Sequence, residues 1–214
     1  MATNDTEALV LLKVRAQFVH CFAPRMQKND NGQDVGKFSI AGILTPDHPQ
    51  LPEVWQMMQA AAVNKWKDRA ADVFAELSAS DRLCVHNGNA KMRFDGMAGN
   101  YYINATNKMR PNIKDADGRT PLVETDGKIY AGCYVNLILS MYAQDSANPL
   151  HGKRINCTLL GVQFAGHAPA FGAKQIADDS QFPVVEVPQT SAGFGGMPAM
   201  PGAPAMPGAS AKLW

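Results

Sequence analysis

The segment from Ile129 to Tyr142 constrains the fold more than any other part of the chain, because its residues alternate with a period of two. Successive side chains of a β-strand point to opposite faces, so alternation of this length predicts a strand. One set of positions is small or apolar throughout and is expected to face a core: Ala131, Cys133, Val135, Leu137, Leu139 and Met141. The other set includes Tyr130, Tyr134 and Tyr142 and is expected to face water.

Other segments have the same strand-like character. They span residues 9–18, 37–45, 91–95, 100–107 and 154–164. Gly96-Met97-Ala98-Gly99 separates two of these segments and predicts a hairpin between them. Several short strands joined by turn-rich connections indicate a small closed or nearly closed β-barrel.

A single helical segment interrupts this β pattern. Between Thr45 and Arg82 the composition shifts to Ala, Met, Gln and Lys. The residues that fall near one helical face are Trp55, Met58, Ala62 and Trp66. This spacing predicts one inserted helix from about Pro52 into the seventies, in a fold that is otherwise mainly β.

The last part of the chain has a different composition. From about Gln181 onward Pro, Gly, Ala and Met dominate, and M-P-[AG] units repeat without a helical or strand period. Proline removes backbone donors, so this composition predicts a flexible tail. We therefore expect a folded domain over residues 1–180 and a tail over 181–214, which finishes on the apolar Leu213 and Trp214.

Composition restricts the kinds of partner that the chain can attract. Hydrophobic residues make up 46% of it, which is enough to bury a core, and the formal net charge is only +1. The segment from Arg82 to Lys114 nevertheless carries six basic residues and one acid, Asp95. Affinity for a polyanion would therefore have to come from this local concentration of charge.

The four cysteines and the N-terminus indicate the compartment. Cys21, Cys84, Cys133 and Cys157 form no C-x-x-C pair, so we expect reduced thiols rather than a disulfide framework or a metal site. The acidic start does not fit a secretory signal, and no apolar run approaches the roughly 20 residues of a membrane helix. We expect a cytoplasmic protein with no membrane partner.

The candidate site combines tyrosines with cations. Tyr102, Asn104, Lys108 and Arg110 fall on one side of their segment. The predicted hairpin partner adds Lys91 and Arg93, and the first strand adds Arg15. Aromatic rings can stack on any base for roughly 1–3 kcal/mol, while cations neutralise phosphates. The alternative is that half-exposed tyrosines cover the barrel ends and that the cations are merely solvated.

Acidic residues follow this basic segment directly and would repel phosphate if they lay beside it. They are Asp115, Asp117, Glu124 and Asp126. We expect them on a loop that points away from the basic face.

Several motifs resemble a family of bacteriophage single-stranded DNA-binding proteins. The most specific are N-A-T-N-K-x-R-P, from Asn104 to Pro111, and Y-x-G-C-Y-V, from Tyr130 to Val135. GKFSIAGIL and GKRINCTLLGVQFAGHA add to the resemblance, which runs from about Leu9 to Phe171.

This resemblance implies an oligonucleotide-binding (OB) fold, here a five-stranded barrel plus an extra hairpin. It also implies sequence-independent single-stranded DNA binding in phage replication, recombination or repair. Within the matching motifs it implies DNA contacts by Tyr102, Asn104, Lys108, Arg110, Tyr130 and Tyr134. Arg15, Lys91 and Arg93 are assigned by their strand faces alone.

The tail departs from a common pattern of single-strand binders, in which an acidic tail recruits partners. Only Asp178, Asp179 and Glu186 are acidic after Gln175. Leu213-Trp214 could still recruit replication or recombination proteins, and the chain could also form a homo-oligomer.

No nucleophile elbow, phosphate loop or zinc-protease motif occurs, so we expect neither an enzyme nor a cofactor. Two alternatives stay open at this point. One is a phage structural or assembly protein that uses the same face for subunit contacts. The other is a small metal-dependent nuclease that acts on single strands.

Overall fold

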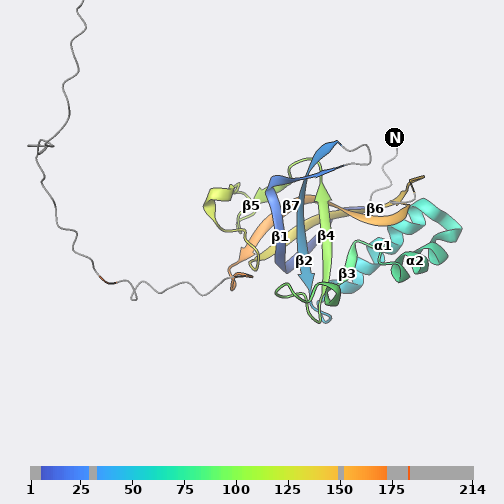
Figure 1. Cartoon of the computed structure of the whole chain (residues 1–214), viewed down its shortest axis with the longest axis horizontal. Helices are drawn as coiled ribbons and strands as arrows, with labels where there is room; N and C mark the ends of the chain where they lie inside the picture. Colours follow the sequence, from blue (N-terminus) through green and yellow to red (C-terminus); the bar gives the residue numbers. More distant parts are fainter. Residues whose placement is uncertain (1–5, 29–32, 149–151, 173–182, 184–214) are drawn as a thin grey trace, which may run out of the picture. The chain divides into compact units, whose positions relative to one another are not determined.

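The computed structural model describes residues 6–28, 33–148 and 152–172, together with Pro183. Seven strands form one sheet in the order β3-β4-β2-β1-β6-β7-β5. Their bounds are β1 Leu9–Lys28, β2 Asp34–Leu44, β3 Val85–Asn87, β4 Tyr101–Asn107, β5 Asn112–Lys114, β6 Tyr134–Asp145 and β7 Lys153–Gly166. A further, parallel pairing of β4 with β7 closes β1, β2, β4, β7 and β6 into a five-stranded barrel, as an OB-fold requires (Figure 1).

A helical insertion follows β2 and packs beside one end of the barrel (Figure 1). It consists of α1 (Leu51–Trp66) and α2 (Ala70–Ala79), joined by the short 3₁₀-helix η1 (Lys67–Arg69). Proline at the start of α1 is tolerated because the first turn has no intrahelical partner for its backbone nitrogen. Val54 and Met58 of α1 and Leu77 of α2 are buried against the core. Of the predicted helical face, Met58 and Ala62 are buried, whereas Trp55 and Trp66 are only partly buried. No helix in the described part of the chain has both the length and the apolar character needed to cross a membrane.

The barrel interior contains large aliphatic side chains, most of which come from alternate strand positions. Those with no exposed surface include Leu11, Ile40, Ile103, Leu137, Leu139, Met141 and Leu159. Of the predicted core set, Cys133 and the β6 residues from Val135 to Met141 are buried, whereas Ala131 is only partly buried. Gly42 is needed where strands approach closely, because a Cβ there would lie 2.8 Å from Leu137 Cδ1.

The predicted strand over 129–142 begins later than expected, at Tyr134. Residues 130–133 form a turn instead, closed by the bond from Cys133 N to Tyr130 O at 3.2 Å. Gly132 adopts φ 106° there, and a Cβ on it would lie 2.5 Å from Pro169 O. Tyr130 is therefore not on the strand face that carries Tyr134.

The predicted hairpin strand over 91–95 is wrong. Residues 88–91 form the 3₁₀-helix η2 (Gly88–Lys91), and turns continue to Gly99. The turn bonds are Phe94 N to Lys91 O at 3.0 Å and Met97 N to Phe94 O at 3.2 Å. Burial of Met97 against the barrel folds this segment back as a loop, and β3 takes the place beside β4.

All four cysteines are free and buried. Burial raises the pKa of Cys21 to about 12, so this thiol stays protonated at neutral pH. The described residues up to Gly172 belong to one compact unit. The predicted domain boundary at 180 and the predicted tail lie outside the described residues, apart from Pro183.

Candidate nucleic-acid interface

The outer face of the barrel carries a row of side chains in cross-strand register. His86 pairs with Tyr102, and Tyr102 with Ile43. Ile43 pairs in turn with Arg15, which pairs with Tyr134. Cross-strand partners project from the same face, so one line of residues crosses β3, β4, β2, β1 and β6. Three of the predicted site residues (Arg15, Tyr102 and Tyr134) belong to this line.

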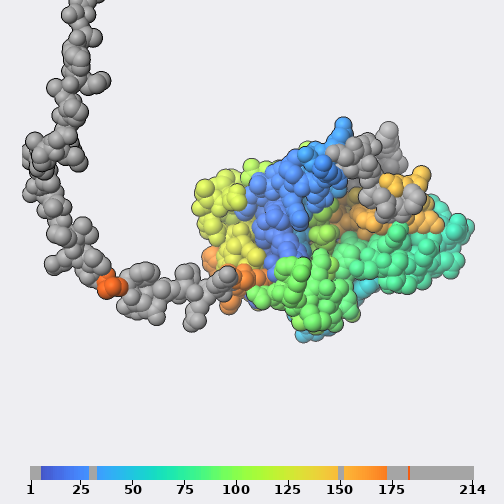
Figure 2. Space-filling view, viewed as in Figure 1, coloured from blue at the N-terminus to red at the C-terminus, as the bar shows by residue number. Residues whose placement is uncertain are grey.

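A second layer covers the middle of this row. The outer cluster consists of Ala41, Ile43, Met97 and Tyr102, with Phe18, Phe94 and Phe171 packed against it. Figure 2 shows part of this layer, the loop 88–99 in green, lying against the blue β1–β2 surface. Tyr102 is only 5% exposed, which corrects its predicted place on a wet face. The reason is that the loop 88–99 folds over it, with Lys91 Nζ 4.7 Å from its ring centroid.

Arg15 is held by the turn before β6 and by the segment that follows β7. Its guanidinium Nε donates to Gly132 O and its Nη2 donates to Pro169 O at 2.9 Å. The same group lies 4.5 Å from the ring of Phe171 and 5.3 Å from that of Tyr134. Arg15 therefore fixes two aromatic rings and two backbone oxygens on the outer face.

Lys91 and Arg93 both lie on aromatic rings of the outer cluster. Lys91 Nζ is 5.4 Å from the ring of Phe18, and Arg93 Cζ is 4.8 Å from that of Phe94. Arg93 is exposed and Lys91 is half-buried. The loop thus carries two cations at the edge of the outer cluster.

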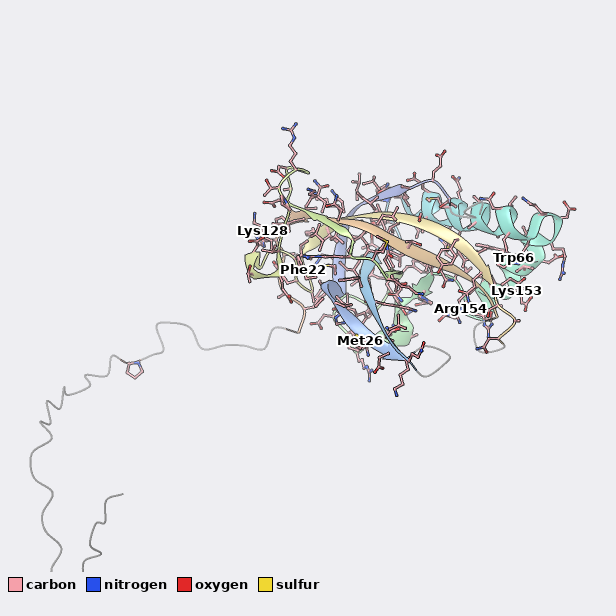
Figure 3. The ribbon with its side chains drawn as sticks, turned by 90° about the horizontal axis from the view of Figure 1, so that it is seen from above. Phe22, Met26, Trp66, Lys128, Lys153 and Arg154 are labelled. Atoms are coloured by element: carbon pink, nitrogen blue, oxygen red, sulfur yellow. The ribbon has the colours of Figure 1, made fainter. Side chains whose placement is uncertain are left out.

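An open groove lies beside the covered row, where β4 meets the start of β7. This cavity has a volume of about 290 Å³ and is called the groove below. Its lining residues are Gln27, Lys37, Asp81, Arg82, Leu83, Cys84, His86, Asn104, Thr106, Arg154, Ile155, Asn156 and Cys157. In Figure 3 the labelled Arg154 lies across from the β1–β2 hairpin that bears Met26. The groove contains the predicted site residue Asn104, next to two cations that sequence reasoning did not select, Arg82 and Arg154.

Backbone hydrogen bonds bring these distant residues together. Asn104 N donates to Cys84 O at 3.0 Å, and Ile155 N donates to Arg82 O at 3.1 Å. The segment before β3 is therefore attached to β4 at one point and to β7 at another. This arrangement places Arg82 and Arg154 on neighbouring walls of the groove.

Cationic side chains outnumber carboxylates in the lining of the groove. It is lined by Lys37, Arg82 and Arg154 against one carboxylate, Asp81, which contacts His86 Nδ1 at 2.9 Å. Arg25 is the direct cross-strand partner of Lys37 in the β1–β2 hairpin. Two positive charges directly opposite each other on neighbouring strands repel and destabilise the hairpin, and a bound anion between them would relieve this repulsion.

The remaining predicted residues lie elsewhere. Lys108 and Arg110 are exposed in the turn that follows β4, at the opposite end of that strand from Tyr102. Tyr130 donates its hydroxyl to Ala168 O at 2.8 Å and stacks on His167 with ring centroids 5.9 Å apart. Its visible role is to hold the segment after β7.

The acidic residues expected on a separate loop lie in the connection between β5 and β6. Thr120 donates its hydroxyl to Asp117, which together with two backbone N–H groups lowers the pKa of Asp117 to about 2. Lys128 pairs with Asp115 and lowers the pKa of that carboxyl. Among the described residues, the only carboxylate lining the groove is Asp81, so these acids do not line it.

Comparison with known proteins decides the family. Residues 7–190 match the family described as Enterobacter phage Enc34, ssDNA-binding protein. The chain belongs to this family. Protein p50 of Acyrthosiphon pisum secondary endosymbiont phage 1 is 31% identical over 175 residues, covering 80% of this chain and 90% of that protein.

Solved structures share the fold. The single-stranded DNA-binding protein from bacteriophage Enc34, in complex with ssDNA, superposes with a TM-score of 0.62 at 21% identity, covering 77% of this chain and 89% of that one. Bacteriophage T7 gp2.5, also a single-stranded DNA-binding protein, gives a TM-score of 0.52 at 12% identity, covering 84% and 99%. The Enc34-family likeness therefore extends from sequence motifs to the barrel itself.

Proposed function

We propose that this protein binds single-stranded DNA without reading its sequence, and that the strand lies in the groove. The observation that carries the proposal is the groove itself, with its three cations and its amides, on the outer face of a barrel of this family. In OB-folds, the face of strands two and three and the two loops beside it bind oligonucleotides. Here these strands correspond to β2 and β4, and the groove lies between the β1–β2 hairpin and the start of β7.

The chemistry of the lining fits a strand that is held by its backbone. Lys37, Arg82 and Arg154 neutralise phosphates and release counterions. Asn104 and Asn156 add amides to the lining, and Asn156 Nδ2 donates to Gln144 Oε1 at 2.9 Å. Contacts to phosphates carry no sequence information, so the groove favours any single strand over a particular sequence.

The predicted contacts extend the proposal beyond the groove. Phosphates at the two ends of β4 would be bound by Lys91, Arg93, Lys108 and Arg110. Tyr134 would contribute an aromatic ring to the interface. We assign Arg15, Tyr102 and Tyr130 positioning roles, because each is engaged in holding the outer face together. Direct stacking of Tyr102 on a base stays a prediction, and it requires movement of the loop 88–99.

Within the phage cycle, such a protein would protect transient single strands during replication, recombination and repair in the host-cell cytoplasm. It would melt hairpins by mass action, because binding only the open form shifts the equilibrium. The role is non-enzymatic and needs no cofactor. Recruitment of replication proteins by the tail and formation of a homo-oligomer stay predictions.

A phage structural or assembly protein is the alternative that the family membership does not favour. Large assemblies formed without DNA, measured by light scattering, would support it. A metal-dependent nuclease would instead cut a labelled oligonucleotide on addition of magnesium or manganese.

The test is a titration of a fluorescent mixed-sequence oligonucleotide, followed by anisotropy at several salt concentrations, with the matching duplex as competitor. We expect binding that weakens by about 0.7 log units per phosphate contact per log of salt. Oligonucleotides of a single base type should bind within a few-fold of one another. Absence of binding at low salt, or equal competition by the duplex, would refute the proposal.

A further inference from the structure

Two identical tripeptides, Lys-Met-Arg, occur at residues 91–93 and 108–110. Their methionines are unusually accessible: Met92 is 67% exposed and Met109 is 76% exposed. These are the two highest values among the exposed large hydrophobic side chains of the described residues. Isolated apolar side chains on a surface are ordinary, but a repeated motif that presents the same one between two cations needs an explanation.

Both methionines lie in turns that hydrogen bonds fix. The bond from Phe94 N to Lys91 O, at 3.0 Å, leaves Met92 and Arg93 as the central residues of one turn. In the other turn, Met109 N donates to Asn107 Oδ1 at 3.0 Å, and Asn107 Nδ2 donates to Leu159 O at 2.8 Å. Gly, Pro, Asn, Asp and Ser are the residues that turn geometry favours, so it does not account for methionine at either site.

The two turns lie at opposite ends of the same outer strand. Lys91 contacts the ring of Tyr102 at the start of β4. Lys108 follows the last residue of β4, and the period of two places it on the same face as Asn104 and Thr106. At about 3.3 Å per residue, the six residues from 102 to 108 place the turns about 20 Å apart. The open residues of β4 that line the groove lie between them.

We propose that Met92 and Met109 contact the bases of the bound strand, one at each end of the groove, while the flanking cations hold phosphates. This inference rests on the proposed function and extends it to base contacts. A thioether is flexible and polarizable and makes favourable contacts with aromatic rings in many orientations. It also carries no strong hydrogen-bonding group, so it adds affinity for every base without selecting one.

Met26 provides a matched control. It is 61% exposed and also follows an arginine, Arg25. However, it pairs with Gly36 on the hairpin face opposite to the one shared by Arg25 and Lys37, so it points away from the groove. The inference therefore predicts a different response for Met26 than for the other two methionines.

The first experiment is oxidation footprinting of the full chain with hydrogen peroxide, which converts each exposed thioether to a sulfoxide. Rates are followed residue by residue by mass spectrometry, with and without a saturating mixed-sequence oligonucleotide. We expect bound DNA to slow oxidation of Met92 and Met109 at least about fivefold and to leave Met26 unchanged. Equal rates with and without DNA at Met92 and Met109 would overturn the inference, provided that anisotropy shows the strand to be bound.

The second experiment compares Met92→Ala/Met109→Ala with Met92→Leu/Met109→Leu and with Met26→Ala. The double alanine variant should raise Kd about three- to tenfold, the leucine variant should recover part of this, and Met26→Ala should match the wild type. The salt slope should not change in any variant, because no charge is removed. Wild-type Kd in the double alanine variant would overturn the inference alone, whereas a wild-type protein that does not bind DNA would overturn the proposed function.

Discussion

Removing the three cations of the groove should reduce both the affinity for single-stranded DNA and its dependence on salt. The variant is Lys37→Ala/Arg82→Ala/Arg154→Ala, whose three side chains line one cavity. Each phosphate contact to a single strand contributes about 0.7 to the slope of log K against log salt. Three lost contacts therefore flatten the slope by about 2 units, so the loss of affinity is largest at low salt and shrinks as salt increases.

The assay is fluorescence anisotropy with a mixed-sequence oligonucleotide between about 50 and 200 mM salt, the range over which such slopes are measured. The matched control removes three positive charges from the helical insertion, in Lys65→Ala/Lys67→Ala/Arg69→Ala. It changes the net charge equally but leaves the groove intact. If the two triple variants had the same slope, binding would depend on overall charge, and the assignment of the groove would be refuted.

Three further predictions concern the packing of the barrel and the hydrogen bonds of the acidic loop. Tyr102→Ala should lower the free energy of unfolding in urea by about 3 kcal/mol, because the ring is buried in the outer cluster. Tyr102→Phe should stay within about 1 kcal/mol of the wild type. Equal stability of the two variants would contradict this packing. Gly42→Ala should cost about 1–3 kcal/mol in the same assay, since the new methyl group would lie 2.8 Å from the buried Leu137 Cδ1. Hydrogen bonds to the charged form depress the pKa of Asp117 to about 2. Their contribution to the stability of the folded state is therefore complete above the ordinary pKa of 3.8 and is lost as pH falls toward 2. Thr120→Val should raise that pKa in a carboxyl NMR titration, and an unchanged value would show that the hydroxyl bond is unimportant.

The alternation within β6 predicted much of the barrel. Val135, Leu137, Leu139 and Met141 are all fully buried, as a period of two required. Alternation could not locate the start of the strand, because residues 130–133 continue the same pattern in a turn. That turn depends on Gly132 lying close to Pro169, a contact between positions far apart in the sequence.

The predicted hairpin failed for a similar reason. Lys91 to Asp95 alternates like a strand, but burial of Met97 and the contacts of Phe94 with Phe18 fold the segment over the sheet. Tertiary packing overrides local β-propensity in such cases. Tyr102 was placed on the correct face of β4, but no local pattern indicated that a loop would cover it.

The groove could be predicted only in part. Asn104 lies in a motif with a known family resemblance, whereas Arg82 and Arg154 belong to segments that are far apart along the chain. They become neighbours because the segment before β3 bonds to both β4 and β7. The opposed pair Arg25 and Lys37 likewise becomes visible only when the register of β1 and β2 is known.

Amide hydrogen exchange in the presence and absence of a single-stranded oligonucleotide tests most directly whether DNA lies in the groove. We expect bound DNA to slow exchange in peptides covering residues 81–87, 103–110 and 153–158, which supply the groove and the turn after β4. Peptides of the helical insertion, 51–79, should exchange at unchanged rates. Slowed exchange in the insertion or in the acidic loop 115–126, with unchanged exchange around the groove, would contradict the account.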